Sequence, residues 1–155
     1  EDGSVRLWNM GDGGEAKMSS LCTYLDSNVL IAAWRGEVLA KASARAVLDD
    51  PKRCFFVSNF VRLEVLPKPV FYRQTAEIAF MAMVLDSAKQ VLITPALIQR
   101  AIRLASQYNI APLDAFHVSA AAEIGVDELV TLEKQEKPMC QQTEVRVVSI
   151  FQSLK

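Results

Sequence analysis

The sequence has few nitrogen and sulfur groups of the kind that bind metals, with one histidine and three cysteines in 155 residues. Cys22, Cys54 and Cys140 are odd in number and far apart, which is typical of reduced thiols and leads us to expect a cytoplasmic protein. A zinc site and a disulfide scaffold are therefore not expected. The chain also lacks a run of roughly 18 apolar residues and a signal-peptide pattern, so no membrane association is predicted.

The chain has no excess of either charge, since 17 Lys and Arg residues balance 18 Asp and Glu residues. Binding to nucleic acid irrespective of sequence usually requires a basic excess, so that class is not favoured, although a local basic groove is compatible with the balance. Glycine is scarce after residue 17, because four of the six glycines precede it. We interpret residues 1–17 as an upstream remnant, a flexible linker or a tag-like segment, and residues 18–155 as one domain.

Strand-like apolar runs alternate with helical segments from residue 20 onward. We expect strands over residues 20–26, 54–58, 91–94, 128–132 and 145–150, and helices over residues 29–50 with a break at Gly36, 59–66, 70–88, 95–109 and 112–124. Strands separated by helices indicate βαβ units, and hence an α/β fold with three layers (α/β/α) around a mostly parallel central sheet.

Four acidic residues fall where such a sheet binds ligands. Asp26 ends the first predicted strand, Glu64 lies on the helix after the second, Asp114 is in the first turn of a late helix, and Glu133 follows the fourth strand. Because ligands bind beyond the carboxyl ends of parallel strands, we expect all four to face one edge. Clustered carboxylates repel one another unless a divalent cation such as magnesium or manganese binds them. This pattern predicts metal-assisted hydrolysis of phosphodiester bonds.

Four short motifs in this order make the chain similar to the PIN-domain ribonuclease family, which includes the VapC-type toxins. The motifs are LDSNVLI at residues 25–31, VSNFVRLEVL at 57–66, DAFHVSAA at 114–121 and LVTLEK at 129–134. The resemblance covers roughly residues 20–150. It implies a parallel sheet between helices, a magnesium- or manganese-dependent endoribonuclease that cuts RNA, a candidate antitoxin partner and a homodimer.

The resemblance also implies roles for individual residues. Asp26, Glu64 and Asp114 would form the acidic core that holds the metal, and Glu133 would be the fourth acidic position. Aspartate is commoner at that fourth position, so the longer Glu133 side chain leaves open whether it binds metal directly, through water or not at all. Three further residues would support the site: Asn28 and Ser58 by hydrogen-bonding the carboxylates or a water on the metal, and Thr131 by fixing the end of the fourth strand.

Each of these residues also has an ordinary structural explanation. Asp26 could be a solvated loop residue, Glu64 a surface residue paired with Arg62 or Lys68, Asp114 a first-turn helix acid, and Glu133 part of a charged turn. The single histidine, His117, shares a helix face with Asp114, because the two are three residues apart. It could shuttle protons or pack beneath the site and bond to the backbone.

Two other functions remain open at this point. Glu133 in place of aspartate would also suit a catalytically inactive PIN fold that binds RNA or protein. A phosphotransfer enzyme of the haloacid dehalogenase type also uses an aspartate after the first strand. That chemistry requires a second aspartate two positions later, where this chain has Asn28, so we do not favour it.

Overall fold

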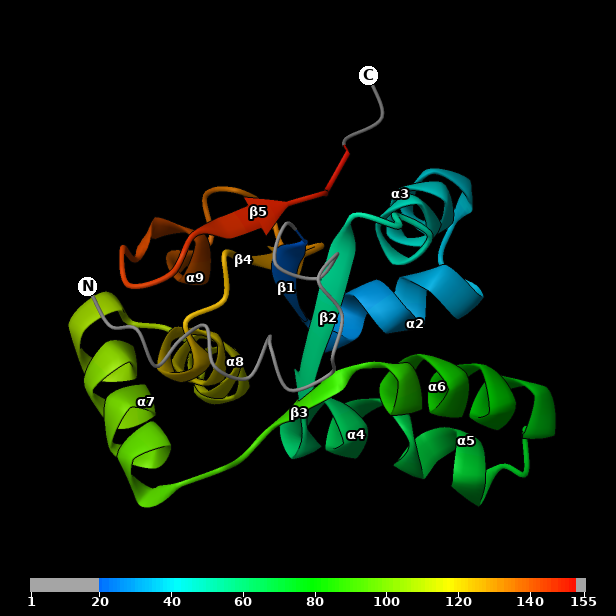
Figure 1. Ribbon diagram of the computed structural model, residues 1–155, viewed down its shortest axis with the longest axis horizontal. Helices are drawn as coiled ribbons and strands as arrows, with labels where there is room; N and C mark the ends of the chain where they lie inside the picture. The colour runs from blue at the N-terminus through cyan, green and yellow to red at the C-terminus, as the bar shows by residue number, and fades with distance from the viewer. Residues whose placement is uncertain (1–19, 153–155) are drawn as a thin grey trace.

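The computed structural model describes residues 20–152 and has the predicted three-layer α/β/α architecture (Figure 1). Its central sheet has five strands, all of them parallel, in the order β3-β2-β1-β4-β5. The strands are β1 (Leu21–Leu25), β2 (Arg53–Ser58), β3 (Lys89–Val91), β4 (Glu128–Thr131) and β5 (Val147–Ser149). The expectation for residues 1–17 lies outside the described part of the chain.

The strand order places β1 at the centre of the sheet. The chain runs from β1 through β2 to β3 on one side, and then crosses to β4 and β5 on the other side. Such a reversal of direction opens a crevice beyond the carboxyl ends of the two central strands, which is where ligands bind in sheets of this type. Here that crevice lies beyond β1 and β4, which pair in register from Thr23 opposite Glu128 to Leu25 opposite Val130.

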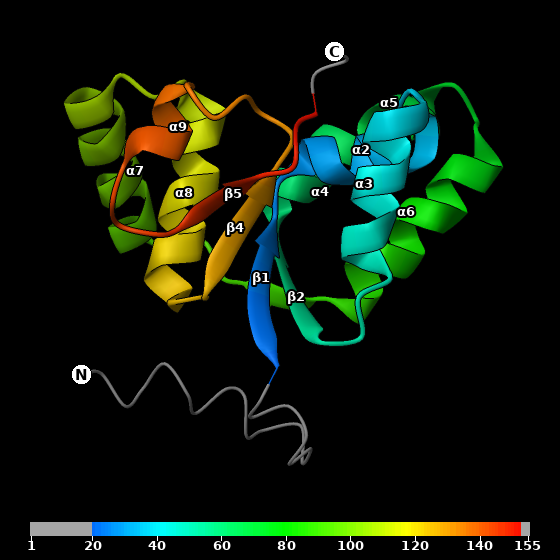
Figure 2. The ribbon, with the colours of Figure 1, turned by 90° about the horizontal axis from the view of Figure 1, so that it is seen from above.

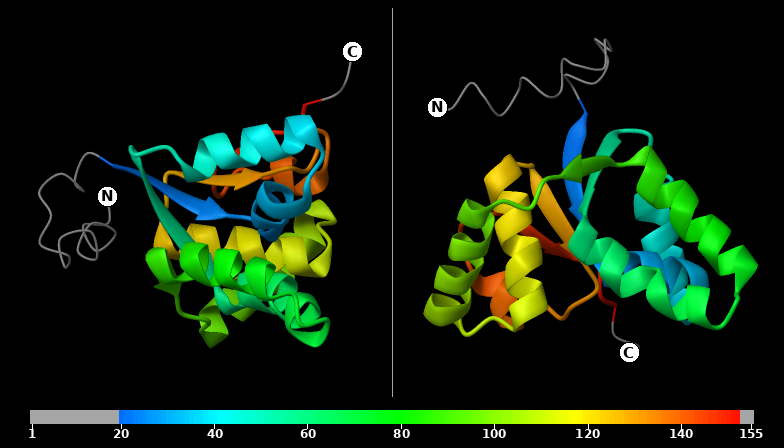
Figure 3. Two further views of the ribbon diagram at one scale, coloured as in Figure 1. Left: turned by 90° about the vertical axis from the view of Figure 1, so that its right-hand side faces the viewer. Right: turned by 90° about the horizontal axis from the view of Figure 1, so that it is seen from below.

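Helices cover both faces of the sheet. Figures 2 and 3 show α7, α8 and α9 on one face and the helices from α2 to α6 on the other. The helices are α2 (Ser27–Arg35), α3 (Val38–Leu48), α4 (Asn59–Val65), α5 (Pro67–Phe71), α6 (Thr75–Ser87), α7 (Pro95–Tyr108), α8 (Pro112–Ile124) and α9 (Pro138–Gln141). Because both faces are covered, the central strands are apolar on both sides: Tyr24, Leu25, Phe56 and Leu129 are all buried.

Several helix ends lie where their capping residues predict. The side chain of Ser58 accepts a hydrogen bond from the N–H of Phe60 at the start of α4, and Thr94 caps α7 in the same way. Gly125 ends α8 in the left-handed conformation at φ 72°, which a residue with a side chain adopts at a cost. Gly36 separates α2 from α3, as expected.

Two predicted elements are wrong in extent. The single helix expected over residues 70–88 is two helices, because α5 begins at Pro67, where prolines fit the first turn, and the chain turns at Arg73 with φ 54°. The third strand ends at Val91 and does not reach residue 94. Its partner among residues 20–152 is β2, which ends at Ser58 opposite Val91, so in this described part Leu92 has no strand to pair with and is 80% exposed. The short helix α9 was not predicted.

The apolar helices of the described region are short. None of the helices within residues 20–152 has the length and apolar character that crossing a bilayer would require.

Candidate metal centre

Three side chains from three elements converge at the carboxyl edge of the sheet. Asp26 follows β1 directly, Glu64 lies on α4 and His117 lies on α8. One ligand atom of each residue, a carboxylate oxygen or a ring nitrogen, lies within 4.8 Å of the others. Sequence analysis predicted that Asp26 and Glu64 face the same edge, and the structure places them together there.

Asp26 is buried, with 4% of its surface exposed, so it is not a solvated loop residue. Its backbone N–H donates to the carbonyl of Val130, which ties the end of β1 to β4 at 3.0 Å. Thr131 donates its hydroxyl proton to Asp26 Oδ2 at 2.7 Å. Burial raises the pKa of Asp26, the nearby Glu64 raises it further, and His117 and the Thr131 hydrogen bond oppose the rise. The ionised form is therefore costly here unless a positive charge accompanies it.

Glu64 is held through one of its two carboxylate oxygens. The hydroxyl of Ser27 donates to Oε1 at 2.6 Å, and Nε2 of His117 lies 2.5 Å from the same atom. Burial works against the ionised form, but these two hydrogen bonds outweigh it, so the pKa of Glu64 is lowered. Within residues 20–152 no hydrogen bond reaches Oε2, which leaves that oxygen for a ligand. The expected alternative pairing with Arg62 is not seen, because Arg62 lies 3.7 Å from Asp86.

Asp114 and Glu133 lie near this group but are not within the 4.8 Å cluster. Burial raises the pKa of Asp114 to about 6, and the charges of Asp26, Glu133 and Glu64 raise it as well. Asp114 is therefore close enough to the other three acids for their charges to act on it. Glu133 follows β4, and its backbone N–H donates to Thr131 Oγ1 at 3.0 Å.

Thr131 and Asn28 join the end of β4 to the start of α2. Thr131 Oγ1 accepts from the side-chain amide of Asn28 at 3.3 Å, and Asn28 Oδ1 accepts from the N–H of Leu132 at 3.0 Å. Thr131 therefore lies where it was expected, at the end of its strand and against Asp26. Asn28 instead braces the strand end: in the described part of the chain its hydrogen bonds go to Thr131 and Leu132 and not to a carboxylate.

Ser58 also has partners other than the expected carboxylates. Its hydroxyl contacts the hydroxyl of Tyr24 at 2.7 Å and accepts the N–H of Phe60 at 3.2 Å. One interpretation had His117 bonding to the backbone, but within residues 20–152 its ring nitrogens contact the side chains of Tyr24, Glu64 and Ser27 instead. Sequence reasoning missed Tyr24 as part of this group. The sequence gives no signal for it, because Tyr24 stands in the apolar run of β1 and its partner His117 follows 93 positions later.

The donor set at this edge fits a divalent cation of the magnesium or manganese type. Such cations prefer oxygen ligands, and the edge offers carboxylate oxygens of Asp26, Glu64 and Asp114. The raised pKa values of Asp26 and Asp114 indicate negative charge that the protein alone compensates poorly. Bound cations reverse that effect because they favour the ionised carboxylates.

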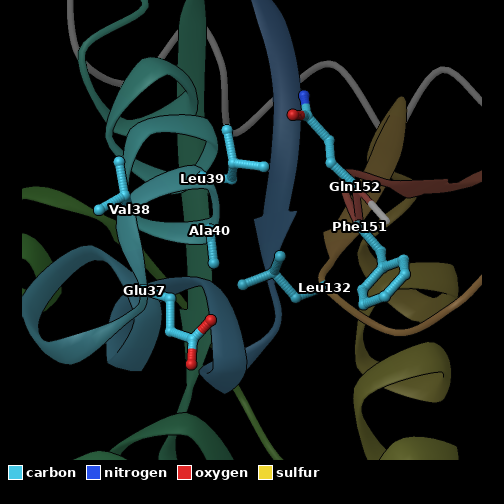
Figure 4. Close-up of a pocket in the computed structure, with 7 residues that line it drawn as sticks. All are labelled: Glu37, Val38, Leu39, Ala40, Leu132, Phe151 and Gln152. Carbon is cyan, nitrogen blue, oxygen red and sulfur yellow. The ribbon is translucent and has the colours of Figure 1, made fainter. Parts of the chain in front are cut away.

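One pocket in the surface lacks this chemistry. It has a volume of about 760 Å³ and lies between the start of α3 and the segment after β5, and Figure 4 shows the side chains that line it. Its lining is apolar at Val38, Leu39, Ala40, Leu132 and Phe151, with Glu37 and Gln152 as its polar members. With one carboxylate it does not resemble the acidic edge.

The family follows from comparison with known proteins. The model of the PIN domain family matches residues 23–136, which is most of the chain, and the chain therefore belongs to that family. The residues matched include Asp26, Glu64, Asp114 and Glu133. No curated protein matches the sequence.

Solved structures of toxins share the fold. A toxin–antitoxin complex from Klebsiella pneumoniae aligns with a TM-score of 0.62 at 21% identity, over 82% of this chain and 96% of that one. VapBC2 from Rickettsia felis, bound to a promoter DNA fragment, aligns with a TM-score of 0.64 at 12% identity, over 83% and 98%. VapC20 from Mycobacterium tuberculosis, described as a sarcin-ricin loop cleaving toxin, aligns with a TM-score of 0.59 at 15% identity, over 80% and 98%. At these identities the likeness concerns the fold.

Proposed function

We propose that this protein is a metal-dependent endoribonuclease that hydrolyses RNA phosphodiester bonds with magnesium or manganese, and that Asp26, Glu64, Asp114 and Glu133 form its acidic site. One observation carries the proposal: carboxylates from separate elements gather at the crevice beyond β1 and β4, where burial, and after it the charges of the neighbouring acids, raises the pKa of Asp114 to about 6. Such an arrangement is unfavourable for the protein alone and favourable around a cation.

The residues at this edge would have different roles in binding the cation. Asp26 and Glu64 offer oxygens to the cation, while Thr131 and Ser27 hold those two carboxylates by hydrogen bonds of 2.7 and 2.6 Å. Asp114 is in the first turn of α8, where the helix dipole favours its negative charge. A divalent cation bound here would make water a better nucleophile at neutral pH and stabilise the charge that develops on the phosphate.

Calorimetric titration of manganese into the wild type and Asp26→Asn, with RNA cleavage assayed on the same samples, tests the proposal. Asn keeps an oxygen that can accept from Thr131 and removes the charge, so we expect manganese binding and cleavage both to be lost. Asp49→Asn is the matched control, because Asp49 is exposed and lies before β2, at the opposite edge of the sheet. Cleavage that survives in Asp26→Asn, or that needs no divalent cation, would overturn the proposal.

The position of Glu133 supports one alternative function. Its carboxylate lies outside the tight cluster of ligand atoms, and it stands where aspartate is commoner in the family. An inactive PIN fold that binds RNA or protein would fit this observation. Manganese binding without cleavage of single-stranded or hairpin RNA, together with RNA binding unaffected by Asp26→Asn, would favour the binding module.

We also propose an antitoxin partner, a homodimer and a cytoplasmic location. Two of the solved structures with this fold are toxin–antitoxin assemblies by their descriptions, which supports the first. Expression of the wild type without a partner should slow growth, and Asp26→Asn should relieve that effect.

Light scattering tests the homodimer and should give twice the 17.2 kDa mass of the chain. A monomer at micromolar concentration would contradict the homodimer.

A further inference from the structure

We propose that His117 and Tyr24 are positioning residues that hold the carboxylate of Glu64 in the orientation that binds the cation, an inference that rests on the proposed function. Neither residue needs to touch metal or RNA for this role. They would act through Glu64 alone, from within the core of the protein.

A continuous string of hydrogen bonds runs from the Glu64 carboxylate through side chains of three other elements and back to a backbone N–H at the start of its own helix, α4. Glu64 Oε1 lies 2.5 Å from Nε2 of His117, and Nδ1 of the same ring lies 2.9 Å from the hydroxyl of Tyr24. The Tyr24 hydroxyl lies 2.7 Å from Oγ of Ser58, which accepts the N–H of Phe60 at 3.2 Å. The string therefore runs from α4 through α8 and β1 to the end of β2.

The chemistry of the groups gives this string a direction. An ionised carboxylate can only accept hydrogen bonds, so Nε2 of His117 is the donor to Oε1 of ionised Glu64. In the neutral ring, Nδ1 then accepts the proton of Tyr24, and Tyr24 in turn accepts from the hydroxyl of Ser58. Ser58 has an oxygen lone pair left for the N–H of Phe60, so each hydroxyl and ring nitrogen in the string is satisfied.

Burial makes the string rigid. Tyr24 and Ser58 are 0% exposed and His117 is 1% exposed, so no water is needed or admitted between them. Buried polar groups that lose a partner are costly, which favours the complete network over partly broken ones. The ring of Phe60 also meets His117 edge-on, at 6.4 Å between centroids, and limits its rotation.

The end point of the string distinguishes positioning from ordinary core packing. A purely structural network would connect buried groups to one another, whereas this one ends on a carboxylate that is 28% exposed. Within residues 20–152 both hydrogen bonds to the Glu64 carboxylate go to Oε1, from His117 and from Ser27, so the side chain is held in place while Oε2 is left for a ligand. A free glutamate would instead lose rotamer entropy on binding a cation. Because the string already orders the Glu64 side chain in the folded protein, this entropy is not lost when the cation binds.

Tyr24→Phe is the sharpest test, because it removes one hydroxyl and preserves the packed ring. Ser119→Ala is a matched control: Ser119 is equally buried and on the same helix as His117, but its hydroxyl donates to the carbonyl of Leu97, away from the site. Manganese affinity is measured by calorimetry at fixed pH, and the thermal unfolding of each metal-free variant is recorded beside it. We expect affinity to fall by about 10-fold in Tyr24→Phe, a typical cost of removing a group that orients a metal ligand, and to stay at the wild-type value in Ser119→Ala.

Two further variants use the histidine itself. His117→Gln keeps an N–H donor near the place of Nε2, whereas His117→Leu keeps neither contact. Affinity should therefore fall further in His117→Leu than in His117→Gln. Nitrogen hyperfine coupling in the electron paramagnetic resonance of bound manganese provides an independent readout, and we expect no directly bound imidazole.

The outcomes separate this inference from the proposed function. A wild type that binds no manganese overturns both. Manganese binding that is normal in the wild type and equally strong in Tyr24→Phe overturns the positioning role alone. So does an affinity loss in Ser119→Ala as large as that in Tyr24→Phe, or nitrogen coupling that shows His117 bound to the cation.

Discussion

Removing the charge of Asp114 should stabilise the metal-free protein. The pKa of this carboxyl is raised from 3.8 to about 6 by burial and by the neighbouring acids, so its ionised form destabilises the fold at neutral pH. Asp114→Asn keeps the shape of the side chain and removes the charge. We expect the variant to be more stable than the wild type at pH 8 in the presence of a chelator.

The size of the effect follows from the pKa. A rise from 3.8 to about 6 corresponds to at most about 3 kcal/mol at about 1.4 kcal/mol per tenfold change. Asp114 is partly exposed, so solvent screening reduces this to about 1 kcal/mol. For a chain of this length that is a rise of about 2–4 °C in the melting temperature.

The pH dependence has a definite sign. The folded protein binds the proton of Asp114 more tightly than the unfolded chain does, so the wild type loses stability as pH rises from about 4 to 6. Below that window both states are protonated and the charge effect vanishes; above it the advantage of Asp114→Asn is complete. Saturating manganese should make the wild type more stable than Asp114→Asn. A manganese concentration of 100 times the dissociation constant adds about 2.7 kcal/mol to the free energy of unfolding of a protein that binds it.

The difference in stability can be measured by urea unfolding of the wild type and Asp114→Asn at pH 4, 5, 6 and 8, with and without manganese. Asp49→Asn, at an exposed position before β2, is the control and should show neither the gain nor the reversal. The reasoning is refuted if Asp114→Asn gains nothing at pH 8, or if its gain is the same at all four pH values.

Two other substitutions test how the edge of the sheet is built. Thr131→Val removes the donor to Asp26 Oδ2 and the acceptor for the N–H of Glu133, and should lower the free energy of unfolding by about 1–3 kcal/mol in urea; an unchanged urea midpoint would contradict it. Gly36→Ala would place its Cβ 2.5 Å from the carbonyl oxygen of Ala32, so we expect a loss of about 1–3 kcal/mol, seen as a lower melting temperature. Wild-type stability in that variant would mean that the link between α2 and α3 shifts freely.

Much of the fold could be predicted because local signals and the global pattern agree. Thr94 with Pro95, Pro112 with Gly125, and the alternation of apolar runs each mark boundaries that the structure confirms. The length of β3 could not be predicted in this way, since residues 91–94 have strand character and only the end of its partner β2 stops the pairing. Tertiary context decides such ends.

The acidic residues of the candidate site could be predicted from the sequence, but the residues that hydrogen-bond to them could not. Asp26 stands out because an acid at the end of an apolar run is unusual, whereas Glu64 was singled out by the resemblance of its motif to the family. Tyr24 looks like an ordinary apolar strand residue, and its hydroxyl acquires meaning only when His117, 93 positions away, is placed against it. Ser27 is likewise unremarkable until α4 brings Glu64 to it, 37 positions later. Contacts between residues so far apart in the sequence depend on the topology of the fold and cannot be inferred from the spacing of residues.

The order of the strands also sets when the proposed metal centre can form during synthesis of the chain. Asp26 and Glu64 leave the ribosome early, with the first two strands, whereas Thr131 lies 105 positions after the aspartate that it holds. A nascent chain that ends before β4 lacks both this hydroxyl and the strand that pairs with β1. For the proposed nuclease, this order would keep the unfinished chain inactive beside the messenger RNA that encodes it.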